Sequence, residues 1–149
     1  LRRGDLNAVH RSDEPRPDVA QAYIDRSGAA WRTNVFSVPV IGGGDGGALA
    51  TARDIDRFLR VIADGSLLGP ELSALMRTPH VPAYGDRSQG YGPIVAPGGI
   101  FQHGGGDPGV AVFARHHGDE DLSVVVMLNV DGVFDDVWDV VSSGLPTHP

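Results

Sequence analysis

The sequence predicts an α+β protein in which helices cover a small antiparallel sheet of three to four strands. Segments whose apolar residues repeat every three or four positions predict helices, and segments whose apolar residues alternate or run together predict strands. Two of the predicted helices come before all but one of the predicted strands, and one helix follows them. This grouping is typical of helices lying on an antiparallel sheet rather than between parallel strands.

Length, charge and composition exclude several classes of protein. A chain of 149 residues suits one domain with one core. The net charge of −7 and the absence of a basic patch argue against a nucleic-acid partner. No run of about 18 apolar residues exists, so no membrane span is expected. The absence of cysteine excludes disulfides and thiolate chemistry, and it leaves the compartment open between bacterial cytoplasm and cell envelope.

The basic residues are all arginine: the chain has 12 of them and no lysine. Lysine is the basic side chain whose pKa can fall into a catalytic range, whereas arginine stays charged. A mechanism that uses a Ser-Lys pair or a Schiff base therefore cannot be complete within this chain.

The first part of the chain differs from the rest. Residues 1–30 are polar, contain Pro15 and Pro17, and show no sustained period, so we expect an extended arm that lies across something else. Residues 31–149 form the α+β part. Within it, residues 31–41 are apolar but interrupted by Pro39, which predicts an edge strand or an irregular segment.

Two helices are expected next. The spacing of Ile55, Phe58, Leu59 and Ile62 predicts a helix over residues 51–63. Thr51 is its expected N-cap, with Asp54 three residues later completing a capping box. We also expect an i, i+4 ion pair between Asp56 and Arg60, and Gly65 as the stop. A shorter helix should begin at Pro70, bury Leu72, Leu75 and Met76, and end before Pro79.

The remaining segments supply the sheet and a last helix. Residues 89–95 and 99–103 predict two short strands, and residues 110–116 alternate as a half-buried strand does. The segment from Leu122 to Leu128 is apolar on both faces, which predicts a central strand. A final helix is expected to begin after a cap at Asp131 and to bury Phe134 and Trp138.

A histidine and a glycine run join two of these strands. His103 is followed by Gly104, Gly105, Gly106 and Asp107. Adjacent glycines cost backbone entropy, so such a run is expected where φ must be positive or where something approaches the bare backbone. Either explanation points to a site or a tight corner.

Two other motifs are weaker candidates for a functional site. Gly42, Gly44 and Gly47 satisfy the G-x-G-x-x-G pattern of dinucleotide-binding folds, but the predicted helix begins only at Thr51 and the strands are expected to be antiparallel. His116 and His117 precede three acidic residues and could ligate a metal. Adjacent strand residues point to opposite faces, so we expect a solvated hairpin tip and no metal site.

Taken together, several segments resemble the serine β-lactamase-like hydrolases, a superfamily that includes class C β-lactamases, penicillin-binding D,D-peptidases and related esterases. Gly46-Gly47, with Thr51, Asp54 and Phe58 after it, is similar to a conserved segment of that family. His103-Gly104-Gly105 resembles the family's third motif, which is Lys-Thr-Gly in many members and His-x-Gly in others. The segment 122–132 resembles the family's last core strand.

The resemblance implies a role for each residue of the glycine run. His103 would be catalytic, lining one wall of the acyl site and polarising the substrate or orienting the hydroxyl network. Gly106 would donate one of two oxyanion-hole N–H groups. Gly104 and Gly105 would contact the substrate, with Gly105 keeping the backbone free of a β-carbon. No cofactor is implied.

The same resemblance shows what this chain lacks. The family's nucleophile is the serine of Ser-x-x-Lys, which a chain without lysine cannot contain. No tyrosine stands in the context of the second motif. We therefore expect an incomplete fold, the C-terminal part of a serine hydrolase acting on esters, amides or β-lactams, inactive alone. Its partner would be the missing N-terminal portion or a second copy. The alternative is a non-catalytic binding or assembly module that retains the scaffold.

Overall fold

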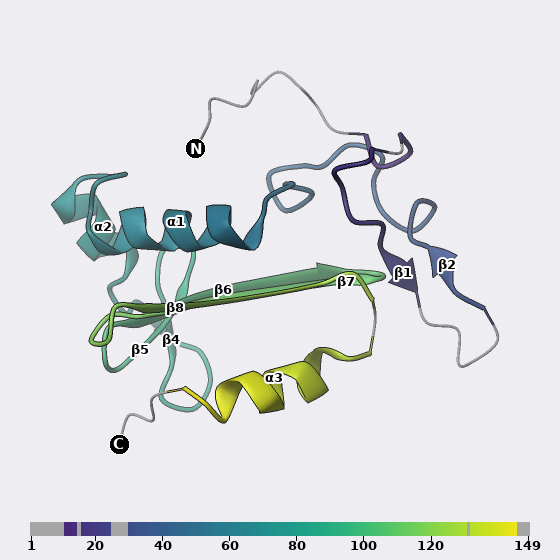
Figure 1. Cartoon of the computed structure of the whole chain (residues 1–149). Helices are drawn as coiled ribbons and strands as arrows, with labels where there is room; N and C mark the ends of the chain where they lie inside the picture. Colours follow the sequence, from purple (N-terminus) through teal and green to yellow (C-terminus); the bar gives the residue numbers. More distant parts are fainter. Residues whose placement is uncertain (1–10, 15, 25–29, 131, 146–149) are drawn as a thin grey trace.

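The computed structural model describes residues 11–14, 16–24, 30–130 and 132–145. In this part of the chain, six strands form an antiparallel sheet in the order β3-β4-β5-β6-β7-β8, with α1 and α2 on one face and α3 on the other (Figure 1). The elements are β1 Tyr23–Ile24, β2 Arg32–Thr33, α1 Ala52–Ala63, α2 Pro70–Met76, β3 Val81–Pro82, β4 Ser88–Gln89, β5 Ile94–Ala96, β6 Ile100–Asp107, β7 Val110–His117, β8 Leu122–Leu128 and α3 Phe134–Ser142.

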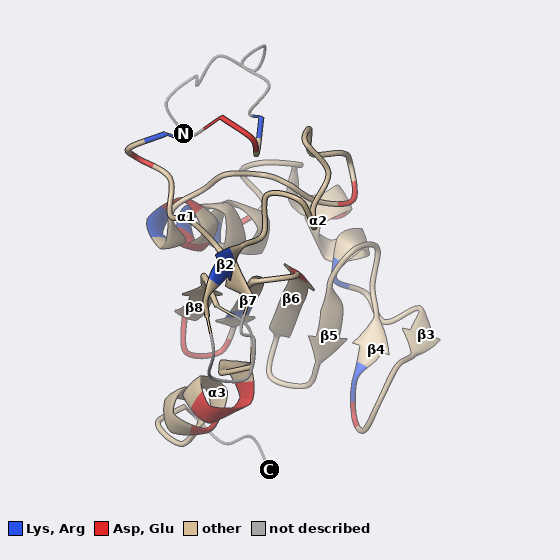
Figure 2. Ribbon diagram, turned by 90° about the vertical axis from the view of Figure 1, so that its right-hand side faces the viewer, with Lys and Arg blue, Asp and Glu red and all other residues tan. Residues whose placement is uncertain are grey.

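The α+β class is confirmed, but the expected number of strands is too low. Figure 2 shows the six strands side by side from β8 to β3. The single strand predicted over residues 89–95 is wrong, because a turn divides it into β4 and β5. In that turn the Gly90 N–H donates to the Pro93 carbonyl oxygen at 2.8 Å, and Gly92 has a φ of 106°. A positive φ of this kind reverses the chain where a strand would have continued.

The first helix, α1, forms as its sequence predicts. The Thr51 hydroxyl oxygen accepts from the Asp54 N–H at 3.2 Å, and the Asp54 carboxylate accepts from the Thr51 N–H at 3.2 Å, which completes the capping box. Asp56 and Arg60 form the expected ion pair at 2.9 Å. Gly65, with a φ of 78°, lets the chain leave the helix.

The core lies between α1 and the sheet. Leu59 and Ile62 of α1 are buried against Val95 of β5, Phe101 of β6 and Ala114 of β7. The helix lies over β7 and β8 rather than over β6. One face of β6 is therefore covered by α1 only near its beginning.

The second helix, α2, begins at Pro70 as predicted, but the expected burial of its leucines is wrong. Leu72 is 58% exposed and Leu75 is 46% exposed, whereas Met76 packs against the core. The fully buried residue of α2 is Ser73, on the other side of the helix. The helix has thus docked through the side that carries Ser73 and Met76, and Leu72 and Leu75 face away from the core.

The strand that carries the glycine run is longer than predicted. We expected it to end at His103, but β6 continues through Gly104, Gly105 and Gly106 to Asp107 and pairs with β7 from Phe101 to Asp107. None of these three glycines has a positive φ. The run is therefore extended strand backbone and not a corner.

The position of β8 is the clearest disagreement with the sequence. The segment Leu122–Leu128 is a strand as predicted, but it is the edge strand of the sheet and not a central one. Just beyond its end, the Tyr23 N–H donates to the Asn129 carbonyl oxygen at 2.9 Å. Along β8 itself, no strand among the described residues pairs with the edge that faces away from β7.

The described segments before α1 contain two short strands, β1 and β2. Within residues 31–41, only Arg32 and Thr33 form a strand, β2, which pairs with β1. The arm expected over residues 1–30 lies partly outside the described residues, which exclude 1–10, 15 and 25–29. The expected cap at Asp131 also lies outside them. None of the described helices has the length and hydrophobicity needed to cross a membrane.

Candidate functional site

The glycine run forms an open edge of the sheet. On one side, β7 pairs with β6 from Phe101 to Asp107. On the other side, β5 pairs only with Ile100, Phe101 and Gln102. From His103 onward, this second edge of β6 has no partner strand among the described residues. Backbone N–H and C=O groups of alternate residues point to such an edge and are available to an incoming group.

The three glycines of the run are not equivalent. A β-carbon on Gly104 would lie 3.1 Å from the Phe113 ring, and one on Gly106 would lie 2.8 Å from the Val110 carbonyl oxygen. The backbone of β7 therefore requires glycine at position 106, whereas a β-carbon at position 104 would need the Phe113 ring to shift by a few tenths of an ångström. A β-carbon on Gly105 would have nothing within 4 Å. The absence of a side chain at Gly105 has no packing reason within the described residues and leaves space beside the strand.

His103 and Gly105 share the face of the sheet on which α1 lies. Directly opposed residues point to the same face, and His103 is opposite Ala114, which packs under α1. The His103 side chain is nevertheless exposed, because α1 covers β7 and β8 and not this part of β6. The structure thus places His103 beside an uncovered, glycine-lined surface.

On the opposite face of the sheet, a series of side-chain contacts holds β6 in place. The Gln102 side-chain Nε2 donates to the Tyr84 hydroxyl at 2.9 Å, and the Arg115 Nε donates to the Gln102 side-chain Oε1 at 2.9 Å. The Arg115 guanidinium lies 4.7 Å from the Trp138 ring centroid and 5.3 Å from that of Phe113. Burial lowers the pKa of Arg115. These contacts fix the side chain of Gln102, the residue that precedes His103 in β6.

Sequence reasoning missed this support. The alternation of residues 110–116 correctly placed Phe113 and Arg115 on one face, but nothing in the spacing linked Arg115 to Gln102 or to Tyr84. An arginine on the same face as two aromatic residues, Phe113 and Trp138, is the signal that could have revealed it.

The two adjacent histidines do not form the solvated hairpin tip that we expected. His116 is 2% exposed and His117 is 1% exposed. His116 lies on Phe101, with ring centroids 5.2 Å apart, and its Nδ1 is 3.0 Å from the Ser123 hydroxyl oxygen. Burial lowers the pKa of His116, so the neutral ring is favoured. Among the described residues, no three His, Cys, Asp or Glu side chains are grouped to hold a metal ion.

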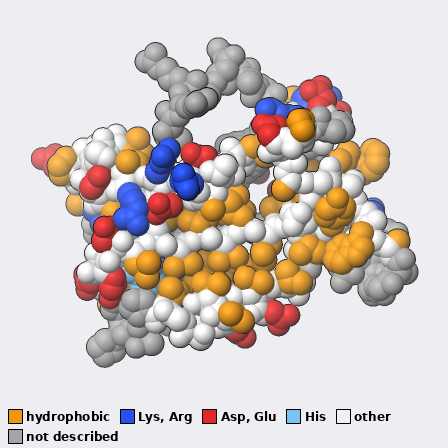
Figure 3. All heavy atoms as spheres, viewed as in Figure 1, with side chains coloured by type: hydrophobic (Ala, Val, Ile, Leu, Met, Phe, Trp, Pro, Cys, Tyr) orange, Lys and Arg blue, Asp and Glu red, His pale blue; other side chains and the backbone are white. Residues whose placement is uncertain are grey.

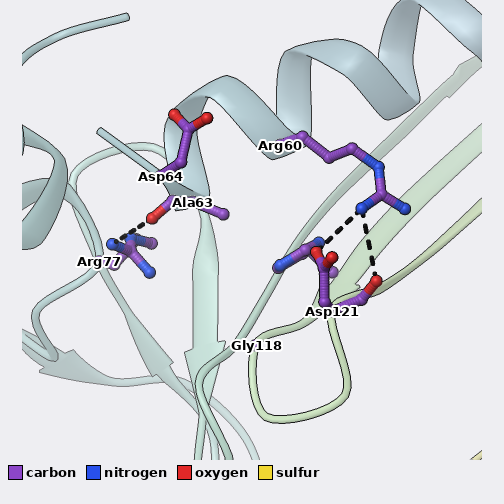
Figure 4. A pocket seen from close by; sticks show the side chains of 7 residues that line it. Arg60, Ala63, Asp64, Arg77, Gly118 and Asp121 are labelled. Carbon is purple, nitrogen blue, oxygen red and sulfur yellow. Dashed lines mark hydrogen bonds and ion pairs between the residues drawn. The ribbon is translucent and has the colours of Figure 1, made fainter. Parts of the chain in front are cut away.

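A cavity of about 440 Å³ lies between the end of α1 and the hairpin that joins β7 to β8 (Figure 4). Its lining consists of Arg60, Ala63, Asp64, Arg77, His116, Gly118 and Asp121. Arg60 donates to the Asp121 carboxylate at 2.9 Å, and Arg77 donates to the Ala63 carbonyl oxygen at 3.2 Å. These contacts hold the hairpin between β7 and β8 and the segment after α2 to α1. The cavity includes none of the glycine-run residues.

The G-x-G-x-x-G pattern lies in an exposed loop. Gly42, Gly44 and Gly47 precede α1 by several residues, and every pair in the six-stranded sheet is antiparallel. A dinucleotide site of this type needs a parallel βαβ unit whose helix begins at the glycines. The dinucleotide alternative therefore lacks its structural context.

Two solved structures resemble this chain in sequence and in fold. The chain is similar to a penicillin binding protein from Bacillus halodurans, with 30% identity and a TM-score of 0.83 over 92% of this chain and 44% of that one. It is also similar to a D-stereospecific amidohydrolase from Streptomyces sp., with 25% identity and a TM-score of 0.60 over 82% of this chain and 38% of that one. The chain thus spans less than half of either structure. No curated protein sequence matches it significantly.

The sequence model of the Beta-lactamase family matches residues 3–140, which is most of the chain. The family match covers α1, the glycine strand β6 and the strands on either side of it. This agreement in sequence and in fold confirms the resemblance, and the chain belongs to the Beta-lactamase family.

Proposed function

We propose that this chain is the oxyanion-strand part of a serine hydrolase and that the nucleophile belongs to a portion of the enzyme not contained in it. One observation carries the proposal. From His103 onward the edge of β6 that faces away from β7 has no partner strand among the described residues, and Gly105 has no side chain to cover the backbone there. An acyl group lying along this edge would meet backbone donors without steric hindrance.

Each residue of the run has a role in this proposal. Gly106 donates its N–H to the oxyanion of the tetrahedral intermediate, a contact typically worth about 3–4 kcal/mol in the transition state. His103 lines the wall of the site and polarises the substrate or orients the hydroxyl network. Gly104 and Gly105 present bare backbone to the substrate. Gln102, held by Arg115, keeps the strand in place.

The family comparison narrows the substrate class. One similar structure is a penicillin binding protein and the other is a D-stereospecific amidohydrolase. Amide and β-lactam carbonyl groups are therefore the first candidates, with activated esters next. The serine would attack this carbonyl, the amine, thiol or alcohol would leave, and water would release the acyl group.

Exposed apolar side chains on α2 support the proposal that a further portion of the enzyme packs against this chain. Leu72 and Leu75 of α2 are 58% and 46% exposed. Figure 3 shows apolar side chains gathered in a band over β8, between α1 and α3. Apolar surface of this kind is typical of a face that packs against another element.

Intact-mass measurement after incubation with a fluorescent penicillin tests the proposal. Alone, the chain should gain no adduct, because it has no lysine and hence no Ser-x-x-Lys. Mixed with or fused to the unmatched portion of a similar penicillin binding protein, it should support a single adduct on a serine of that added portion. A stoichiometric adduct on a serine of this chain would overturn the proposal.

A matched pair of variants locates the site in the complemented enzyme. Gly105→Val places a side chain on the open face of β6 and should abolish adduct formation. Gly44→Val makes the same change in an exposed loop where a β-carbon also meets nothing within 4 Å, and it should leave the adduct intact. Equal labelling of both variants would place the acyl site elsewhere.

The coding sequence upstream of Leu1 gives an independent check. A continuous frame that encodes a Ser-x-x-Lys helix supports the proposal. A frame that encodes no such helix leaves the non-catalytic binding or assembly module as the better explanation.

A further inference from the structure

Three aspartates of the sequence are followed directly by glycine. They are Asp45, Asp64 and Asp131, and no asparagine is followed by glycine. At such a step the glycine nitrogen can attack the side-chain carboxyl carbon of the aspartate, because no β-carbon on the glycine hinders the approach. Asp131 lies outside the described residues. The structure describes the surroundings of the other two, and these surroundings differ.

The step from Asp64 to Gly65 is held by hydrogen bonds at the end of α1. The Asp64 N–H donates to the Arg60 carbonyl oxygen at 2.9 Å, and the Asp64 carboxylate accepts from the Ser66 N–H at 2.8 Å. The Gly65 carbonyl oxygen accepts from the Gly69 N–H at 2.8 Å. Attack needs rotation about both the side-chain and the backbone bonds of the aspartate. These hydrogen bonds oppose both rotations.

The charge state of Asp64 also disfavours the attack. Hydrogen bonds with Ser66 hold the pKa of Asp64 below its ordinary value. A carboxylate reacts poorly with a nitrogen nucleophile, because the hydroxyl group of the neutral acid is the group that leaves as water. At any given pH, Asp64 is therefore less often in its reactive, protonated form.

The step from Asp45 to Gly46 lies in an exposed loop before α1. All residues from 42 to 49 are exposed. A β-carbon on Gly44 or on Gly46 would have nothing within 4 Å, so there is open space on both sides of Asp45. The Gly46 N–H donates to the Gly43 carbonyl oxygen at 3.4 Å, which exceeds the usual range of about 2.7–3.2 Å. The attacking nitrogen is thus only weakly held.

We propose that Asp45 is a modification site, at which aspartate converts to isoaspartate through a cyclic imide. The Gly46 nitrogen forms a bond to the Asp45 Cγ and loses its proton, and the carboxyl hydroxyl leaves with that proton as water. A second water molecule then opens the five-membered ring. Where it breaks the bond between the nitrogen and the original backbone carbonyl carbon, the chain continues through Cγ as isoaspartate. One water is lost and one is gained, so no other reactant is needed.

The modified residue would lie in a loop whose two ends are close together. A β-carbon on Gly42 would lie 2.8 Å from the Gly47 Cα. Isoaspartate adds one carbon atom to the backbone inside this loop, and the N-cap of α1 at Thr51 lies beyond it. We therefore expect the modified chain to keep its fold, so that isoaspartate accumulates in folded protein.

Peptide mapping after prolonged warm incubation of the chain near neutral pH tests the proposal. Trypsin separates the two steps, because Asp45 is the only aspartate of peptide 33–53 and Asp64 is the only aspartate of peptide 61–77. Isoaspartyl and aspartyl peptides have equal mass and different retention. A protein isoaspartate methyltransferase, with S-adenosylmethionine as methyl donor, labels the isoaspartyl form alone. Label should appear in peptide 33–53 several-fold faster than in peptide 61–77.

The denatured chain is the matched control. In denaturant the hydrogen bonds of Asp64 are lost, so the two peptides should be labelled at similar rates. Equal rates in the folded chain would overturn the proposal. So would a folded chain that gains no label in peptide 33–53 while the denatured chain gains it there.

A pair of variants tests the chemistry on either side of Asp45. Gly46→Val hinders the attacking nitrogen and should slow labelling of peptide 33–53 several-fold. Gly44→Val places the same side chain before Asp45, where a β-carbon also meets nothing within 4 Å, and should leave the rate unchanged. Equal rates for the two variants would contradict attack by the Gly46 nitrogen. None of these measurements depends on the proposed function, which is tested by acylation.

Discussion

A β-carbon added to Gly106 would lie 2.8 Å from the carbonyl oxygen of Val110, on the neighbouring strand β7. This backbone atom cannot rotate away as the end of a side chain could. The adjacent glycines of β6 therefore differ in their surroundings. A β-carbon at Gly105 would point into open space, whereas one at Gly106 would collide with the backbone of the neighbouring strand.

We expect Gly106→Ala to lower the free energy of unfolding by about 1–3 kcal/mol, because overpacking displaces the strand. Gly105→Ala should be neutral or should stabilise by about 0.5–1 kcal/mol, because alanine loses less backbone entropy in an extended strand. Urea unfolding of both variants measures the difference. Equal destabilisation of the two would show that Gly105 is also a packing residue.

Arg115 should contribute to stability through its shape as well as its charge. Arg115→Lys removes the planar group that lies over Trp138 and Phe113 and the Nε donor to Gln102. We expect a loss of about 1–2 kcal/mol in unfolding free energy. Arg57→Lys on the exposed side of α1 is the control and should change stability by less than about 0.5 kcal/mol. Similar results for the two variants would rule out a specific role for the stacked guanidinium.

Acid should destabilise the protein through His116. Its pKa in the folded protein lies below the ordinary value of 6.5, mainly because the ring is buried. The unfolded chain therefore binds a proton more readily, and the stabilisation present above pH 6.5 is lost as the pH falls towards the folded-state pKa. His116→Gln should flatten the slope of unfolding free energy against pH in this interval. An equally steep slope in His116→Gln and in the natural protein would contradict this account.

The N-cap of α1 can be tested by removal and rescue. Thr51→Ala deletes the hydroxyl that accepts from the Asp54 N–H, and it should cost about 1 kcal/mol of stability. Thr51→Ser keeps the hydroxyl and should restore most of the loss. Hydrogen bonds from Thr51 also hold the pKa of Asp54 below its ordinary value, so that pKa should rise in Thr51→Ala. An unchanged carboxyl titration by NMR would count against the capping box.

Most local structure could be predicted from the sequence because its causes are local. The capping box of Thr51 and Asp54, the start of α2 at Pro70 and the alternation in β7 each depend on residues close together in the chain. The motif His103-Gly104-Gly105 was likewise found by its residues alone. The candidate site was therefore located in the sequence, although its geometry was not.

Burial and strand order could not be predicted in this way, because they depend on which segment lies beside which. Leu72 and Leu75 form an apolar stripe, yet the tertiary structure turns that stripe outward and buries Ser73 instead. His116, expected in solvent, is enclosed between Phe101 and Ser123. The errors share one physical origin, since periodicity shows which residues should be buried but not what covers them.

By itself, the sequence determined the α+β class, the main helices and strands, the family resemblance and the absence of a Ser-x-x-Lys nucleophile, since all of these depend on residue type and short-range spacing. Only the tertiary structure decided that β5 stops beside Gln102 and leaves the rest of β6 open, and that β8 lies at an edge. These properties arise from the pairing of distant segments. The same pairing creates the candidate acyl site on β6.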